Sequence, residues 1–243
     1  LTQKRLASGK KVNSALDDPV AYFTAVNHEQ RSSDLAARKD EMSEAVQTIK
    51  AGDAGISSIN TLIAAAKSLA TSALSADSTT ASTLMAQFNT VRTQIDEMAA
   101  DSGYKGVNLL GGESVSLTVK FDELGDSKLG ISGFDASTSG LSITEGSGWV
   151  SGTDVVASTI DAAIVELDDA KNTLRTQSSK LANNLSIITA RQEFTQGMIN
   201  VLKDGAASLT NADMNEEGAN MLMLQTRQSL GTTSLSLASQ AAQ

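Results

Sequence analysis

Apolar residues recur at intervals of seven along the N-terminal half of the chain, and this repeat constrains the fold more than any other feature. One stripe consists of Leu35, Met42, Ile49, Ile56, Ile63 and Ala70. A second set, Ala45, Ile59, Ala66 and Ala73, occupies the intervening heptad positions. A heptad stripe of this length places its apolar residues on one helix face, which needs a partner helix along its whole length. The repeat therefore predicts a long helix inside a helical bundle.

The predicted first helix has a clear start and is followed by a shorter helix. Asp17 or Asp18 is expected to cap it, and Pro19 suits the first helical position because its missing N–H is not needed there. After a predicted break at 75–83, apolar residues lie alternately four and three positions apart. They are Leu84, Phe88, Val91, Ile95 and Met98. This spacing predicts a second helix that folds back beside the first.

A third helix is predicted in the C-terminal half, with Gly205 as its expected stop. Its apolar positions begin with Ile160, Ile164, Leu167, Leu174, Leu181, Leu185 and Ile188. The three patterns together predict a mostly α fold, an elongated antiparallel helical bundle whose core joins residues distant in sequence. The predicted core residues are Ile49, Ile56, Ile63, Leu84, Phe88, Ile95, Leu167, Leu174, Leu181 and Leu185.

A glycine-rich segment separates the second and third helices. Of the 18 glycines, eleven fall between Asp101 and Gly152, and the same window holds a single alanine. Because glycine is a poor helix former, this segment is predicted to be a small β-type insert. Residues 115–121 alternate apolar and polar side chains as a half-buried strand does, and segments 129–133 and 141–144 are the predicted partner strands.

Composition excludes several classes of function. The chain has no Cys and one His, so it offers no thiolate nucleophile, no Cys-ligated metal and no His-rich metal site. Its net charge of −9 argues against a nucleic-acid partner, which needs a basic surface. No apolar run approaches the roughly 18 to 20 residues of a membrane span. The sequence therefore predicts neither a cofactor, a nucleic-acid partner nor membrane insertion.

The two ends of the chain carry helical patterns of their own. Leu1 to Ser8 resembles the tail of a helix closed at Gly9, and Asp213 with Glu216 forms a capping box for a helix that runs to Gln243. The apolar residues of this last helix, Leu222, Met223, Leu224, Leu230, Leu235 and Leu237, wrap around it. A helix that is apolar on several sides needs several neighbours. The expected neighbours are other copies of the same chain.

Three motifs resemble those of bacterial flagellins. RLASGKKVNSALDDPVAYFT at 5–24 is similar to their N-terminal segment. GYKGVNLLGG at 103–112 resembles the turn that ends their outer helix pair, with Tyr104 in the aromatic place and Lys105 where Asn is usual. Residues 209–243 resemble their acidic turn and C-terminal helix, with Asn211 in place of the first Asp. The resemblance covers about four-fifths of the chain and fails across 113–153, where flagellins vary most.

The resemblance implies a subunit of the bacterial flagellar filament, truncated at both ends. Residues 1–12 with 206–243 would form the inner coiled coil, 13–112 with 154–205 the long bundle, and 113–153 an outward-facing insert. The implied partners are other copies of the chain, hook-associated junction and cap proteins, and a flagellar export chaperone. The implied location is extracellular, reached without a cleaved signal peptide. No catalysis is implied.

The expected subunit-interface residues lie in the terminal segments. They are Arg5, Leu6, Lys10, Lys11, Asp213, Glu216, Glu217, Leu222, Leu230 and Leu237. The basic cluster consists of Arg5, Lys10 and Lys11, and the acidic turn consists of Asp213, Glu216 and Glu217. The cluster is expected either to be solvated or to meet the acidic turn of the same or a neighbouring subunit. Because exposed ion pairs contribute little to stability, they would mainly set the register of the contact.

Two other functions fit the sequence less well than a filament subunit. A hook–filament junction protein would share the terminal motifs. A cell-surface polysaccharide-binding module would need aromatic platforms, and the chain has only Trp149, two Tyr and five Phe. The adjacent carboxylates of Asp17–Asp18 and Glu216–Glu217 are better explained by helix capping than by acid–base catalysis.

Overall fold

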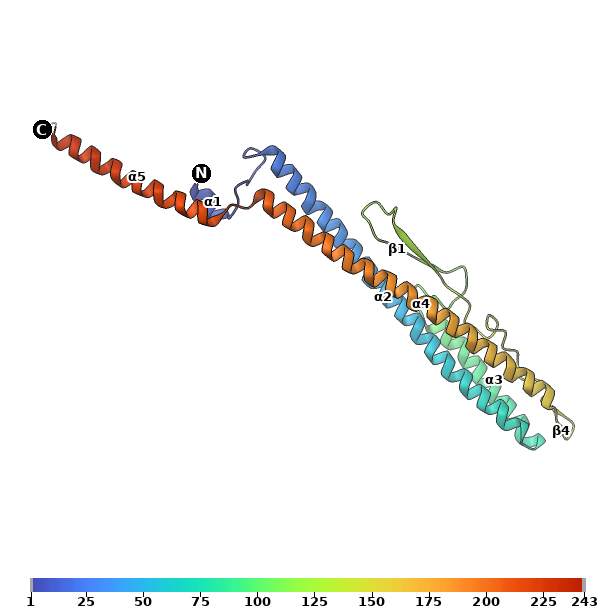
Figure 1. Cartoon of the computed structure of the whole chain (residues 1–243). Helices are drawn as coiled ribbons and strands as arrows, with labels where there is room; N and C mark the ends of the chain where they lie inside the picture. The colour runs from blue at the N-terminus through green and yellow to red at the C-terminus, as the bar shows by residue number, and fades with distance from the viewer. Residues whose placement is uncertain (1, 242–243) are drawn as a thin grey trace. The chain divides into compact units, whose positions relative to one another are not determined.

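The computed structural model describes residues 2–241. The helices in this range are α1 (Thr2–Ser8), α2 (Pro19–Leu74), α3 (Ser78–Asp101), α4 (Ala157–Thr210) and α5 (Met214–Ala241). The strands are β1 (Ser116–Lys120), β2 (Lys128–Ser132), β3 (Val150–Ser151) and β4 (Asp154–Val155), and they form two antiparallel pairs, β1 with β2 and β3 with β4. The predicted mostly α fold with a small β-rich insert is confirmed (Figure 1).

The chain divides into two compact units. One comprises residues 37–195, and the other comprises residues 1–36 with 196–243. Helices α2 and α4 contribute to both units, and each unit has a hydrophobic cluster of its own. In the smaller unit this cluster consists of Leu35 on α2 with Ile199 and Leu202 on α4.

The larger unit is a three-helix bundle of α2, α3 and α4, which run side by side in Figure 1. Its core joins Ile63 of α2, Phe88 of α3 and Leu167 of α4, which are far apart in sequence. Eight of the ten predicted core residues are buried here: Ile49, Ile56, Ile63, Phe88, Ile95, Leu167, Leu174 and Leu181. Leu84 and Leu185 are half-buried and pack against this core. The seam residues therefore provide the apolar burial that holds the bundle together.

Short polar side chains cap the helices of the bundle. The Asp18 Oδ1 atom accepts a hydrogen bond from the Ala21 N–H at 3.0 Å, so Asp18 is the cap and Pro19 the first helical residue of α2. Asp17 instead accepts the N–H groups of Asn13 and Ser14 in the preceding turn. The break predicted at 75–83 is shorter than expected, because Asp77 accepts the Thr80 N–H and starts α3 at Ser78.

The predicted stop of α4 at Gly205 is wrong. The helix continues to Thr210 because Ala206 and Thr210 are buried in the smaller unit, and the Thr210 hydroxyl donates a hydrogen bond to the Ala206 carbonyl. A glycine inside a helix costs only about 1 kcal/mol relative to alanine, which the packing of one additional turn offsets. Tertiary packing rather than local preference therefore decides where α4 ends.

Strands β1 and β2 form an antiparallel hairpin that corresponds to the segments predicted at 115–121 and 129–133. Leu117 pairs with Ile131 and Val119 with Leu129, so the apolar side chains share one face. Val119 and Ile131 are buried in the core of the larger unit. The Phe121 ring at the end of β1 lies 5.0 Å from the Arg191 guanidinium of α4, a cation–π contact.

The strand predicted at 141–144 is not present. Ser142 has a positive φ of 56°, which interrupts an extended chain, and the segment forms turns that α3 holds. Asp96 accepts the Thr138 N–H at 2.7 Å, and Arg92 donates to the Ile143 carbonyl at 3.0 Å. Leu141 and Ile143 are buried through these turns instead of through a sheet.

The turn at 104–107 is anchored to α2. Tyr104 and Val107 exchange two backbone hydrogen bonds of 2.9 Å, and Lys105 and Gly106 between them both have positive φ. The Lys105 ammonium lies 2.7 Å from a Glu44 carboxylate oxygen, and the Tyr104 hydroxyl donates a hydrogen bond to the same oxygen at 3.1 Å. The hydrogen bond from Lys105 is the main cause that lowers the pKa of Glu44 below its ordinary value.

Candidate assembly surface

Helix α1 packs against the first turns of α5 in the smaller unit. An Arg5 guanidinium nitrogen lies 2.9 Å from a Glu217 carboxylate oxygen, with side-chain exposures of 35% and 8%. Glu217 is the buried residue of α5. Because a buried carboxylate needs a partner charge, Arg5 supplies the compensation that lets Glu217 leave water.

The contact between these two side chains is a single hydrogen bond. The Arg5 Nε atom and the second Glu217 oxygen are both buried without a hydrogen-bond partner in the described chain. Arginine and carboxylate groups can form two parallel hydrogen bonds when they are aligned. The pair therefore forms one of the two hydrogen bonds that an aligned pair would make.

The segment that follows α1 is held by the link between α4 and α5. The Lys11 N–H donates to the Thr210 carbonyl at 2.8 Å, and the Ala212 N–H donates to the Gly9 carbonyl at 2.9 Å. Gly9 has a φ of +68°, as expected for a residue that closes a helix, and Val12 is buried. Backbone hydrogen bonds thus fix the first helix relative to the last.

The other charged residues expected at the interface do not form ion pairs with one another in the described chain. Lys10 forms a backbone bridge with Asn211, and the Lys11 ammonium donates to the Ser208 carbonyl at 3.2 Å. Asp213 caps α5 by accepting the Asn215 N–H at 2.9 Å, and Glu216 is exposed in the first turn of that helix. The structure therefore brings together Arg5 and Glu217 from the predicted basic and acidic clusters.

Most of α5 presents apolar side chains to solvent. Leu222, Leu230 and Leu237 are 67%, 62% and 61% exposed. Met223, Leu224 and Leu235 are also at least half exposed, whereas Leu6 on α1 is half-buried. Exposed apolar area of this extent is typical of protein–protein or membrane interaction sites.

A second exposed apolar face lies at the start of α2, and sequence reasoning missed it. Leu16, Val20 and Phe23 are spaced four and three positions apart and are all exposed. Their spacing is visible in the sequence, but Leu16 precedes the capping aspartates while Val20 and Phe23 follow them, so the cap signal obscures the apolar pattern. This face belongs to the same compact unit as α1 and α5.

The described residues contain no group of three or more His, Cys, Asp or Glu side chains placed to hold a metal ion. None of the helices described is both long enough and apolar enough to cross a membrane. The features that the smaller unit does offer are packing surfaces and one buried ion pair.

Comparison with known proteins agrees with these features. The profile of the family described as bacterial flagellin N-terminal helical region matches residues 1–114. Flagellin FljK of Caulobacter vibrioides is 28% identical over 242 residues, covering 98% of this chain and 86% of the relative. The chain is thus similar to bacterial flagellins along almost its whole length. Flagellin of Listeria monocytogenes is 26% identical, covering 99% of this chain and 87% of the relative.

Solved structures share the fold of this chain. The crystal structure of Bacillus cereus flagellin aligns with a TM-score of 0.54 at 16% identity, covering 64% of this chain and 88% of that one. A putative flagellar hook-associated protein from Vibrio parahaemolyticus aligns with a TM-score of 0.50 at 15% identity, covering 81% and 97%. At these identities the likeness concerns the fold.

Proposed function

We propose that this chain polymerises into the flagellar filament through its terminal segments. The observation that carries the proposal is the exposed apolar surface of α5, with Leu222, Leu230 and Leu237 each more than half exposed. Burying one such leucine contributes about 1.5 to 3 kcal/mol, so several of them supply a strong driving force for association. Helix α1, joined to α5 by Arg5 and Glu217, would enter the same interface through Leu6.

The subunit would use its parts in three ways. Residues 1–12 with 206–243 would form the inner coiled coil, 13–112 with 154–205 the surrounding bundle, and 113–153 the outward-facing insert. Lys10, Lys11, Asp213 and Glu216 would contact a neighbouring subunit, because they are exposed and form no ion pair with one another within the described chain.

Further partners would meet the same surfaces. Hook-associated junction and cap proteins would contact the subunits at the two ends of the filament. A flagellar export chaperone would cover the apolar face of α5 before assembly, because an exposed surface of this kind promotes aggregation. The chain would act as a structural protein without catalysis.

Electron microscopy of the full-length protein under polymerising conditions tests the proposal. Long filaments with a helical repeat are the expected result. Short assemblies that form only on isolated hooks would instead identify a junction protein. A protein that stays monomeric at every concentration and salt condition that polymerises a reference flagellin would overturn the proposal.

A further inference from the structure

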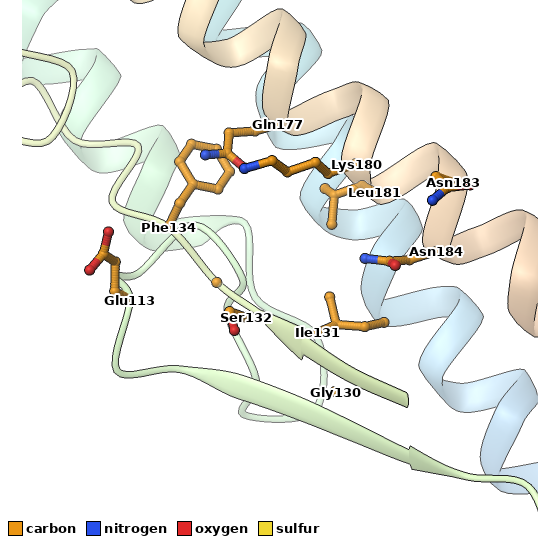
Figure 2. A pocket seen from close by; sticks show the side chains of 11 residues that line it. Glu113, Gly130, Ile131, Ser132, Phe134, Gln177, Lys180, Leu181, Asn183 and Asn184 are labelled. Atoms are coloured by element: carbon orange, nitrogen blue, oxygen red, sulfur yellow. The ribbon is translucent and has the colours of Figure 1, made fainter. Parts of the chain in front are cut away.

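A pocket of about 550 Å³ lies between β2 and α4 in the larger unit (Figure 2). Buried apolar side chains form part of its lining: Ile131 and Phe134 come from the insert, and Leu181 comes from α4. Figure 2 shows Gln177, Lys180, Asn183 and Asn184 along the helix side of the same pocket. The pocket thus combines apolar surface with hydrogen-bond donors, the Lys180 ammonium on the helix side and the Glu113 carboxylate on the insert side.

The polar groups on both sides of this pocket are unused. Within residues 2–241, the side chains of Gln177, Lys180 and Asn183 form no hydrogen bond or ion pair with the protein. On the strand side, the Gly133 N–H donates to the Val115 carbonyl. Hydrogen-bonded and non-hydrogen-bonded residue pairs alternate along an antiparallel hairpin, so the backbone N–H and C=O groups of Gly130 and Ser132 point away from β1. The pocket therefore offers hydrogen-bonding capacity that the isolated subunit does not satisfy.

The tip of the same hairpin has the complementary chemistry. Leu124 at the tip is 85% exposed, and the carboxylates of Asp122 and Asp126 flank it in sequence. Asp122 accepts the Ser127 N–H at 3.2 Å, which helps to hold the turn, and Gly125 has a φ of +80°. Leu124 thus lies largely exposed at the end of a turn that carries two carboxylates, with the Lys120 side chain beside Gly125.

We propose that the hairpin tip of one subunit inserts Leu124 into the β2–α4 pocket of a neighbouring copy. Leu124 would contact Ile131 and Leu181, and the carboxylate of Asp126 would meet the Lys180 ammonium at the pocket rim. The inference deepens the proposed function and rests on it, because it names one contact between subunits of the filament. The exposed leucine of the tip, which matches the apolar lining, and the opposite charges of Asp126 and Lys180 favour a second copy as the occupant.

Leu124 does not fill the pocket of its own subunit, because it is 85% exposed at the hairpin tip. Because the tip and the pocket are different surfaces, the proposed contact joins subunits head to tail. Head-to-tail contacts generate closed rings or open helical arrays, and a filament is of the second kind.

Disulfide trapping tests the contact directly, because the chain has no cysteine. Filaments are grown from a mixture of two full-length variants, Leu124→Cys and Asn183→Cys, and are then oxidised. We expect disulfide-linked heterodimers on a non-reducing gel. The matched control replaces Asn183→Cys by Ser82→Cys, which lies exposed on α3. Absence of the heterodimer, or an equal yield with the control, would overturn the inference.

A polymerisation assay separates this inference from the proposed function. Leu124→Ser is expected to raise the critical concentration at least tenfold, the effect of losing one buried leucine. Lys180→Glu should also weaken polymerisation, and Asp126→Lys should restore it in the double variant. The thermal melting of the monomers should stay the same, because all three side chains are exposed. Wild-type filaments with unchanged behaviour of every variant would refute the pocket contact alone, whereas a wild-type protein that forms no filaments would refute both proposals.

Discussion

Arg5 and Glu217 are 212 positions apart in sequence, yet their side chains meet at 2.9 Å between the first and the last described helix. The carboxylate is the more deeply buried of the two partners. The contact joins the ends of the chain through a charged pair instead of an apolar cluster. Charged pairs of this kind specify which surfaces meet, because a wrong neighbour leaves a buried charge without compensation.

Glu217→Gln is expected to loosen α1 from α5. The amide oxygen can still accept a hydrogen bond from Arg5, but the carboxylate charge is lost and Arg5 is left without its counterion, which weakens the contact by about 1 kcal/mol. Hydrogen exchange of the α1 amides should therefore accelerate while exchange in the larger unit stays the same. The double variant Arg5→Glu with Glu217→Arg should recover part of the protection. Unchanged exchange in α1 of Glu217→Gln would show that the backbone hydrogen bonds at Gly9 and Lys11 suffice.

Gly55→Ala and Gly52→Ala form a matched pair on α2 with opposite expected effects. A Cβ atom at Gly55 would lie 2.6 Å from the Leu110 Cδ1 atom and would collide with the Ser102 side chain. A Cβ atom at Gly52 would meet Leu181 and Leu109 at 3.6 Å and 3.7 Å, which are ordinary contacts. Overpacking costs about 1 to 3 kcal/mol, whereas removing a helix-interior glycine contributes about 1 kcal/mol.

Thermal unfolding followed by circular dichroism distinguishes the two glycine variants. The melting temperature of Gly55→Ala should fall, because the clash outweighs the gain in helix propensity. The melting temperature of Gly52→Ala should rise. A rise in both variants would mean that Ser102 and Leu110 move aside at little cost.

The contribution of the Glu44–Lys105 pair should depend on pH. The hydrogen bond from Lys105 lowers the pKa of Glu44 from its ordinary value of 4.5 in the folded state. The unfolded state therefore takes up the proton first as the pH falls, so the pair stabilises the fold above pH 4.5 and this contribution disappears as the pH falls through the folded-state pKa. Stability curves of the wild type and Lys105→Met should converge at low pH. A constant difference between them from pH 7 to pH 3 would contradict this assignment.

The long helices and the start of α2 were predictable because their signals are local. The heptad spacing around Ile56 and Ile63 requires a helix, and Asp17 or Asp18 with Pro19 gives its start to within one residue. The end of α4 was not predictable, since burial of Ala206 and Thr210 overrides the helix-stopping preference of Gly205. The turns at 138–143 depend on Asp96 and Arg92, which are more than 40 residues away in sequence.

The candidate assembly surface was likewise predictable only in part. The apolar residues of α5 were recognised because their number exceeds what one neighbouring helix can cover. The choice of Glu217 as the partner of Arg5 was not predictable, because Asp213, Glu216 and Glu217 lie within one turn and only the packing of α1 selects among them. A sequence pattern identifies an acidic turn but does not show which carboxylate is buried.

Leu230→Ser is expected to impair polymerisation without affecting the fold of the subunit. Leu230 is 62% exposed, so its loss removes little buried area from the monomer. If the side chain becomes buried between subunits, the substitution costs about 1.5 to 3 kcal/mol per contact, which corresponds to a rise of roughly ten- to hundredfold in the critical concentration. Sedimentation of filaments against free subunits measures this quantity. Gln228→Ser, at an exposed polar position of the same helix, is the matched control and should polymerise as the wild type does. Equal critical concentrations for the two variants would show that Leu230 stays in solvent in the assembled state.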